Sequence, residues 1–257
     1  MRRRALFSLL LLGAGCKARA PEPLRVAAAA DLAHAFAELG PAFSAASKAP
    51  ADLKLTLGST GLLARQLAQG APFDLFLAAN TSYVEQVVKA GACDGKSVAT
   101  YARGRLVLWV KGAGGAELTL ASLVDPRFKH IAIANPEHAP YGKAARDALV
   151  RAGVWSRISE RMVYGENVQQ AFELSRSGNA DVAIVGLSLA IGERVGSWAM
   201  VDEASYAPID QALVVCTHGA DPAGARRLKA FIEAPAGRAI LRKYGFLMPG
   251  ETWALAP

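Results

Sequence analysis

The stretch Leu53–Ala79, LKLTLGSTGLLARQLAQGAPFDLFLAA, contains the pattern from which the fold class follows. Leucines alternate with polar residues over 53–57, a period of two that predicts a strand. Apolar residues then recur at helical spacing until Gly70, and a glycine is typical of a helix end. The apolar run Asp74–Ala79 predicts a buried strand, so the stretch forms one βαβ unit.

The turn of this unit, Gly58–Gly61 (GSTG), lies between the first strand and the helix. The first N–H groups of a helix have no partner within it, and the helix dipole favours negative charge at that end. The hydroxyls of Ser59 and Thr60 add hydrogen-bond donors without adding charge. The turn therefore predicts a cradle for a small oxyanion.

A second turn from strand to helix precedes this unit. Leu24–Ala30 predicts the first strand, and Asp31 stands at the N-cap position of an amphipathic helix. In a parallel sheet both turns lie at the carboxyl ends of their strands and on the same edge. We therefore expect two helix N-termini to point into one crevice.

The rest of the chain alternates in the same way. Helix starts are expected at Tyr141 and at Val168, where Asn167 is the N-cap, and a glycine-rich stretch near residue 112 separates them from the first two. Strands are expected at 105–110, 130–134, 181–185 and 209–216, and helices at 80–90, 120–124, 143–152, 168–177, 222–233 and 235–244. This alternation predicts an α/β fold with two lobes that face one cleft.

Residues 1–15 have the organisation of a secretory signal. Arg2–Arg4 precede the apolar run Ala5–Leu12, which is too short to span a bilayer, and small residues lead to Cys16. This arrangement resembles the lipobox of bacterial lipoproteins, in which the cysteine is lipidated; an ordinary signal cleaved nearby is the alternative. We expect export to the periplasm or outer cell envelope, with 16–23 as a tether lipid-anchored in the membrane at Cys16.

Charge and side-chain spacing exclude other classes of site. Removing residues 1–15 takes away three arginines and no acids, which lowers the formal net charge from +7 to +4. The remaining basic residues are scattered and are not interleaved with aromatic residues, so we expect no nucleic-acid partner. No histidines are spaced at i, i+4 and no Cys/His cluster has ligand spacing, so no metal site is expected. Cys93 and Cys216 are compatible with a disulfide and equally with two buried thiols.

A serine hydrolase with Ser59 as its nucleophile is the alternative function, because this serine follows a strand and precedes a helix. The turn is not G-x-S-x-G, and Gly186–Ala190 lacks the final glycine of that motif. No histidine is placed in the sequence where a general base is needed. We therefore expect that the protein is not an enzyme.

Several segments together resemble the periplasmic molybdate- and tungstate-binding proteins of ABC importers. They are Val26–Leu32 (VAAAADL), Gly58–Gln66 (GSTGLLARQ), Gly70–Phe76 (GAPFDLF), Asn135–Gly142 (NPEHAPYG) and Lys243–Phe246 (KYGF). The resemblance runs over about residues 24–247, nearly the whole mature chain.

The resemblance implies a two-lobed periplasmic-binding-protein-like fold with the ligand cleft between the lobes. Lobe 1 would contain 24–102 and 208–257, and lobe 2 would contain 103–207. It further implies a monomeric solute-binding protein that has no cofactor, captures molybdate or tungstate as transported ligand, and delivers it to a membrane permease.

In this family the oxyanion is held without a counter-charge, by backbone N–H groups and hydroxyls from helix starts of both lobes. Carried over position by position, the ligand-binding residues are Asp31, Ser59, Thr60, Tyr141, Val168 and Gly186. Gly186 stands where a tyrosine is common, and Tyr141 could supply the phenol instead.

Asp31 departs from the family pattern, which usually has a serine hydroxyl in the first turn. An ionised carboxylate a few Å from a dianion is repelled by several kcal/mol at an effective dielectric constant of ~20. Three outcomes remain: Asp31 turns away and caps its own helix, it is protonated in the closed cleft, or it accepts a hydrogen bond from a protonated oxyanion such as hydrogen phosphate or arsenate. We expect the first.

Overall fold

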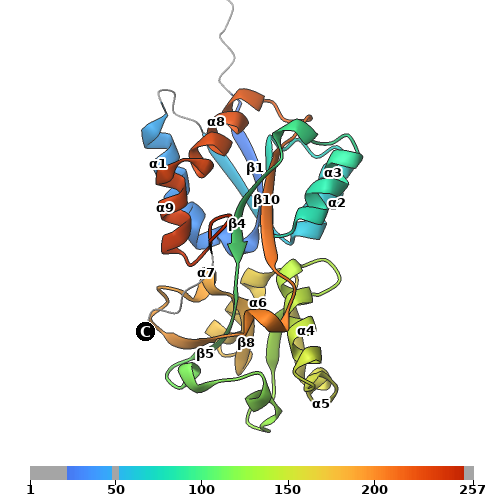
Figure 1. Cartoon of the computed structure of the whole chain (residues 1–257), viewed down its shortest axis with the longest axis vertical. Coiled ribbons are helices and arrows are strands. Elements are labelled where there is room, and N and C mark those ends of the chain that lie inside the picture. Colours follow the sequence, from blue (N-terminus) through green and yellow to red (C-terminus); the bar gives the residue numbers. More distant parts are fainter. Residues whose placement is uncertain (1–21, 48–51, 252–257) are drawn as a thin grey trace, which may run out of the picture.

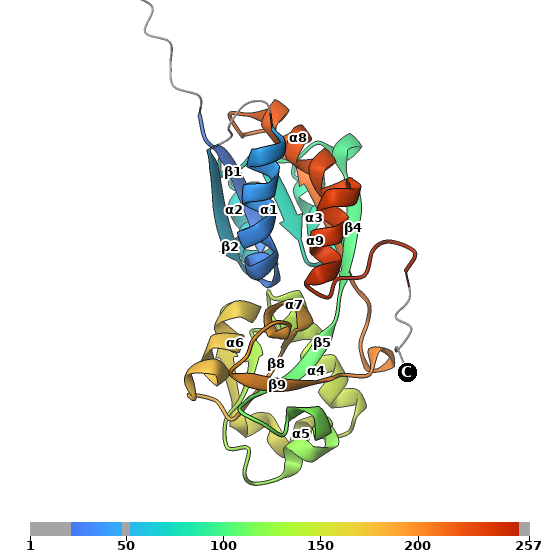
Figure 2. The same ribbon diagram turned by 90° about the vertical axis from the view of Figure 1, so that its left-hand side faces the viewer.

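The computed structural model describes residues 22–47 and 52–251, and it consists of two lobes stacked end to end (Figures 1 and 2). The predicted signal segment, Cys16 and most of the tether lie outside the described residues. Within the described part, no helix is both long and apolar enough to cross a membrane. The predicted α/β class and two-lobed architecture are confirmed.

The first lobe is built on a five-stranded sheet with the order β2-β1-β3-β10-β4. Its strands are β1 (Leu24–Ala29), β2 (Leu53–Gly58), β3 (Leu75–Ala78), β4 (Ala99–Gly104) and β10 (Ile209–Val215). β1 is parallel to β2 and β3, whereas β10 is antiparallel to β3 and β4.

Helices cover both faces of this sheet (Figure 1). One face carries α1 (Ala33–Ala46), α8 (Pro222–Glu233) and α9 (Pro235–Lys243), and the other carries α2 (Thr60–Ala68) and α3 (Thr81–Lys89). Successive residues of β1 alternate between the two cores: Val26 and Ala28 pack with α1, and Ala27 packs with α2 and α3. Because both faces are buried, β1 is apolar apart from Arg25 near its start, as expected for a central parallel strand.

The second lobe has a five-stranded sheet with the order β7-β6-β8-β5-β9. Its elements are β5 (Leu106–Lys111), β6 (Ile131–Ala134), α4 (Pro140–Arg151), α5 (Trp155–Ile158), β7 (Met162–Gly165), α6 (Val168–Ser177), β8 (Val182–Gly186), α7 (Leu187–Ala190) and β9 (Gly196–Met200). Trp109 at the centre of the sheet is fully buried against Phe172 of α6, with ring centroids 5.0 Å apart. This lobe therefore has a core of its own.

The chain passes between the lobes where β4 ends at Gly104 and β5 begins at Leu106, and again between β9 and β10. Arg105 lies at the first crossing and is almost fully buried. Its Nε and Nη2 donate hydrogen bonds to the carbonyl oxygen of Gly245, at 3.2 and 2.8 Å. The crossing is thereby attached to the end of α9 in the first lobe.

Some predicted elements were missed or misplaced. The sequence analysis did not predict β4, β7, β9 or α5, whereas the short helix expected at 120–124 is present as a 3-10 helix at Ala121–Val124. β7 and β9 are short, and their side chains are mostly only partly buried, so the sequence has no strong apolar period there. α4 begins at Pro140, one residue before the helix start expected at Tyr141, because proline is well tolerated in a first helical turn.

Candidate functional site

A small cavity lies between the lobes, with a volume of about 10 Å³. It is lined by Ala29, Ala30, Asp31, Gly58, Ser59, Thr60, Ala79, Ala139, Pro140, Tyr141, Asn167 and Val168. Every residue that the family resemblance assigned to the ligand, except Gly186, lines this one hollow. Residues more than a hundred positions apart in the sequence are therefore brought together.

Three helix N-termini from the two lobes meet at this cavity. α2 begins at Thr60 in the first lobe, and α4 and α6 begin at Pro140 and Val168 in the second. Asn167 caps α6 as predicted, since its Oδ1 accepts a hydrogen bond from the N–H of Gln170 at 3.0 Å. None of the described lining residues is a lysine, arginine or histidine, so partial charges of helix ends supply the positive potential.

The two hydroxyls before α2 have different partners. Thr60 Oγ1 accepts a hydrogen bond from the N–H of Ala79 at 3.2 Å, which leaves its own proton available to a ligand. Ser59 Oγ donates to the carbonyl oxygen of His138 at 2.7 Å, and the N–H of Gly61 donates to the same oxygen at 2.9 Å. His138 belongs to the loop before α4, so Ser59 and Gly61 link the first lobe to the second.

The expectation that no histidine lies near Ser59 was wrong, because His138 Nδ1 is 2.8 Å from Ser59 Oγ. The serine proton, however, is donated to the His138 carbonyl oxygen, and no carboxylate of the described residues hydrogen-bonds to this imidazole. Burial first, and then the charge of Arg65, lower the pKa of His138, so a neutral ring that donates from Nδ1 fits the geometry. The contact between Ser59 and His138 therefore links the two lobes. It lacks the third group that would orient His138 as a catalytic base.

Asp31 does not cap its own helix, so that expectation was wrong. α1 begins at Ala33 without a side-chain cap, and the Asp31 carboxyl group is fully buried. Its Oδ2 accepts hydrogen bonds from Gln211 Nε2 at 2.6 Å and from the Tyr141 hydroxyl at 2.9 Å, whereas its Oδ1 has no partner. Tyr101 completes the network by donating to Gln211 Oε1 at 2.5 Å. The network joins the 3-10 turn that follows β1, and β10 and β4 of the first lobe, to α4 of the second.

Burial determines the protonation of this network. It raises the pKa of Asp31 to about 6, although the hydrogen bonds from Gln211 and Tyr141 act in the opposite direction. Burial and the nearby Asp31 carboxylate raise the pKa values of Tyr141 and Tyr101 well above the ordinary value. Both phenols therefore remain protonated donors.

Gly186 lies outside the cavity lining, behind the ring of Tyr141. A Cβ atom at Gly186 would be 3.0 Å from Cε1 and 3.2 Å from Cζ of Tyr141. Ser188, two residues further on, donates from Oγ to the Asp31 carbonyl oxygen at 2.8 Å. The β8–α7 turn thus supports Tyr141 and Asp31 from behind.

Sequence reasoning missed Gln211, Ser188 and the link through His138. Gln211 had a visible signal, because it is a polar residue inside the apolar strand β10, and it is completely buried. Buried polar side chains need partners, which in this case are Asp31, Tyr141 and Tyr101. Ser188 and His138 had no such signal, since their partners depend on how the lobes meet.

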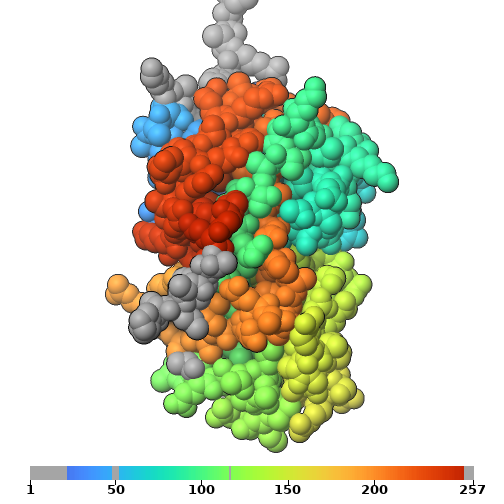
Figure 3. Space-filling view, in the orientation of Figure 1, coloured from blue at the N-terminus to red at the C-terminus, as the bar shows by residue number. Residues whose placement is uncertain are grey.

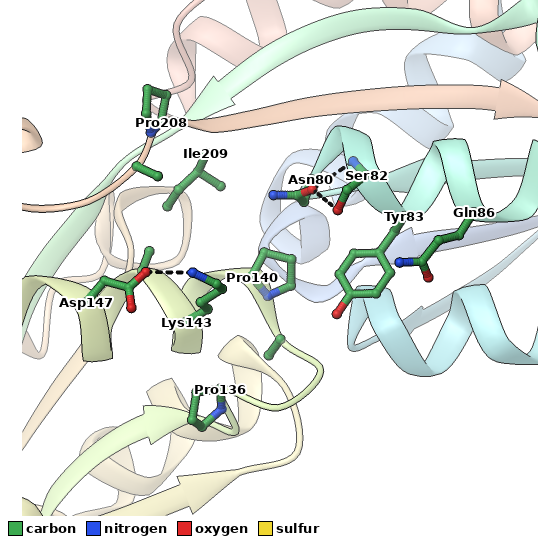
Figure 4. A pocket seen from close by; sticks show the side chains of 13 residues that line it. Asn80, Ser82, Tyr83, Gln86, Pro136, Pro140, Lys143, Asp147, Pro208 and Ile209 are labelled. Atoms are coloured by element: carbon green, nitrogen blue, oxygen red, sulfur yellow. Dashed lines mark hydrogen bonds and ion pairs between the residues drawn. The ribbon is translucent and has the colours of Figure 1, made fainter.

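A larger groove, of about 270 Å³, crosses the outside of the lobe boundary between α3 and α4 (Figure 4). Its polar side chains mostly pair with one another: Lys143 Nζ lies 2.8 Å from Asp147 Oδ2, and Asn80 caps α3 through the N–H of Ser82. The N-cap side chain of α3 is already bonded within its own turn, and the groove is open and lacks the buried hydroxyls of the inner cavity. Among the described residues, no group of three or more His, Cys, Asp or Glu side chains could hold a metal ion.

The family model described as bacterial extracellular solute-binding protein matches residues 24–247. The molybdate-binding protein ModA of Rhodobacter capsulatus is 34% identical over 247 residues, which cover 96% of each chain. The ModA protein of Azotobacter vinelandii is 33% identical over 244 residues, 93% of this chain and 96% of that one.

Solved structures agree with the sequence relatives. The periplasmic molybdate-binding protein of Azotobacter vinelandii superposes with a TM-score of 0.82 at 29% identity, covering 88% of this chain and 99% of that chain. The sulfate-binding protein SubI of Mycobacterium tuberculosis has a TM-score of 0.75 at 16% identity, covering 87% of this chain and 86% of that one, and so shares the fold.

Proposed function

Since the chain belongs to the bacterial extracellular solute-binding protein family, we propose that it captures molybdate for an ABC importer. The observation that supports this function is the convergence of the α2, α4 and α6 N-termini on one hollow, which no described lysine, arginine or histidine lines. Such a site suits a compact oxyanion, because amide and hydroxyl donors can surround it. The names of the relatives and of the similar solved structure support molybdate, and tungstate has the same shape and charge.

The ligand-binding groups in this proposal are Asp31, Thr60, Tyr141 and the first-turn amide of Val168, while Ser59 acts through the link to His138. The open lobes take up the anion, and closure forms the interlobe hydrogen bonds. Closure also removes water, which strengthens each N–H···O⁻ contact. The two arrangements form a two-state system that ligand binding shifts.

The described arrangement of the lobes corresponds to the closed form. On the face shown in Figure 3, the surfaces of the two lobes meet directly. Ala29, Ala30 and Ala79 of the first lobe belong to the apolar core cluster of the second. The closed form presents one continuous surface to a permease.

The proposal also covers the lobe boundaries, the oligomeric state and the membrane anchor. We place the division of the lobes at 24–102 with 208–257 and at 103–207, as the family resemblance implies. The protein acts as a monomer without enzymatic activity, is lipid-anchored through Cys16, and docks on a membrane permease.

The test of this function is a series of thermal melts with molybdate, tungstate, sulfate, phosphate and arsenate at equal ionic strength. An anion at 100 times its Kd adds about 2.7 kcal/mol to the stability of the folded state. In a protein of this size we expect molybdate and tungstate to raise Tm by roughly 5–10 °C, and phosphate to have no effect. A response to none of the five anions would refute the proposal, and a response to phosphate and arsenate alone would favour the protonated-oxyanion alternative.

A further inference from the structure

We propose that this site binds its anion together with one proton, held between Oδ1 of Asp31 and an oxygen of the anion. Asp31 then makes the affinity for the anion depend on pH. It also distinguishes anions that carry a proton from anions that do not. The inference rests on the proposed function, because it concerns the same cavity.

The hydrogen bonds of Asp31 divide its two oxygens into different roles. Oδ2 already accepts from Gln211 Nε2 and from the Tyr141 hydroxyl, so it is the poorer site for a proton. Oδ1 is buried without a partner, on a residue that lines the cavity. A proton on Oδ1 turns an unsatisfied acceptor into an O–H donor, which is the group that an oxyanion requires.

Among the described residues, no cation pairs with Asp31 when it is ionised. The groups that face it are the Tyr141 hydroxyl from α4, the Gln211 amide from β10 and, beyond that amide, the Tyr101 hydroxyl from β4. α7 contributes the hydroxyl of Ser188, which donates to the Asp31 carbonyl oxygen. All of these groups are neutral at physiological pH, because burial keeps both phenols protonated. A dianion would therefore meet the full repulsion of an ionised Asp31.

Protonation of Asp31 is within easy reach at neutral pH. In the closed arrangement burial raises its pKa to about 6, so at pH 7 protonation of Asp31 requires only about a tenfold shift in its equilibrium. The closed arrangement holds this proton below about pH 6 and loses it above. Binding of a dianion above that pH must take the proton up from solvent, whereas a hydrogen phosphate ion can bring its own.

The experiment is calorimetric titration of molybdate into the full exported protein at pH 5.5, 7 and 8, in pairs of buffers with different ionisation enthalpies. We expect uptake of close to one proton per molybdate at pH 8, and about a tenfold loss of affinity per pH unit above pH 6. Sulfate, also a dianion without a proton, tests the same uptake.

The matched variants are Asp31→Asn and Asp147→Asn. The amide in Asp31→Asn keeps an oxygen for Gln211 and Tyr141 and places an N–H donor where Oδ1 lies, so its affinity should be independent of pH, with no proton uptake. Asp147→Asn makes the same change in charge at the exposed pair with Lys143 and should retain the pH dependence of the unmodified protein.

Two different results would overturn the inference. Molybdate binding by the unmodified protein without proton uptake and with the same affinity at all three pH values would refute the shared proton but leave the proposed function intact. Binding of none of these anions at any pH would refute the proposed function, and the inference with it.

The two buried cysteines carry a second, independent inference: we infer that Cys93 and Cys216 form a disulfide in the exported protein. Both are free thiols in the described structure, and they lie directly opposite one another in an isolated antiparallel bridge. The flanking hydrogen bonds run from Asp94 N to Val215 O and from Thr217 N to Ala92 O, at 2.8 and 2.9 Å. This pattern defines the narrow, non-hydrogen-bonded kind of pair, in which Cα atoms are about 4.5 Å apart, within the range for a disulfide.

The oxidation joins the two sulfur atoms and removes two protons and two electrons, which a protein or small-molecule disulfide of the cell envelope accepts as it is reduced to two thiols. A hydrogen bond with the Cys93 thiol, and then burial, raise the pKa of Cys216, so little thiolate exists once the lobe has folded. Oxidation therefore takes place during folding, before the pair is buried.

The test is alkylation of the exported protein in denaturant without reductant, followed by peptide mapping. We expect the peptides of Cys93 and Cys216 to remain unalkylated and linked, and reductant to lower Tm by about 10 °C because the bond closes a long loop. The double variant Cys93→Ala/Cys216→Ala serves as the control, since its Tm should not respond to reductant. Alkylation of both cysteines in the unreduced protein would exclude the disulfide.

Discussion

Replacing Gly61 with alanine is expected to weaken molybdate binding by about 100-fold while the anion-free protein remains as stable as before. A Cβ atom at this position would be 2.7 Å from the His138 carbonyl oxygen, across the lobe boundary, and 2.9 Å from the Tyr83 hydroxyl. The Tyr83 side chain can move, but the carbonyl belongs to the backbone of the other lobe. Relief of the contact therefore requires the lobes to separate, and a penalty of about 3 kcal/mol on the closed form is about 100-fold in affinity.

Calorimetry gives the affinity for molybdate, and a melt without anion gives the stability of Gly61→Ala. Gly40→Ala is the control, because Gly40 lies within α1 with nothing within 4 Å of its Cβ position. We expect that control to bind normally and to gain roughly 1 kcal/mol of stability from helix propensity. Normal affinity in Gly61→Ala would mean that the lobes of the bound protein stay further apart than in the arrangement described above.

The second large effect is expected for Gly142→Ala, which should destabilise the protein by about 4 kcal/mol and abolish the response to molybdate. Gly142 lies in the first turn of α4, directly after Tyr141. A Cβ atom there would be 2.0 Å from the carbonyl oxygen of Ala134 at the end of β6 and 2.6 Å from its carbonyl carbon. Because only backbone atoms are involved, either the helix must move away from the sheet or the strand must distort.

Comparing Gly61→Ala with Gly142→Ala separates an effect on the stability of the fold from an effect on closure of the lobes. Chemical denaturation without anion should detect the loss in Gly142→Ala and little change in Gly61→Ala, whereas melts with molybdate should show a loss of response in both. A stable Gly142→Ala variant that still responds to molybdate would show that α4 can shift without displacing Tyr141, contrary to the close approach seen here.

Local patterns were sufficient to predict most of the fold. The alternating leucines of β2 and the glycine after α2 predicted the βαβ unit, because strand period and helix ends depend on neighbouring residues alone. Asn167 was likewise predicted as an N-cap, and its Oδ1 accepts the expected bond. β9 was missed because it begins with a glycine, is partly exposed and depends on pairing with β5.

The sequence by itself determined which segments carry helix starts with small polar residues and no cation, since these depend on a few adjacent residues. It left the role of Asp31 open among three outcomes. Only the tertiary structure excluded the first of them, capping, because the partners of Asp31 are Tyr141, 110 positions away, and Gln211, 180 positions away. Burial, the unpartnered Oδ1 and the interlobe contacts of Ser59 all arise where the two lobes meet, and no local pattern encodes that surface.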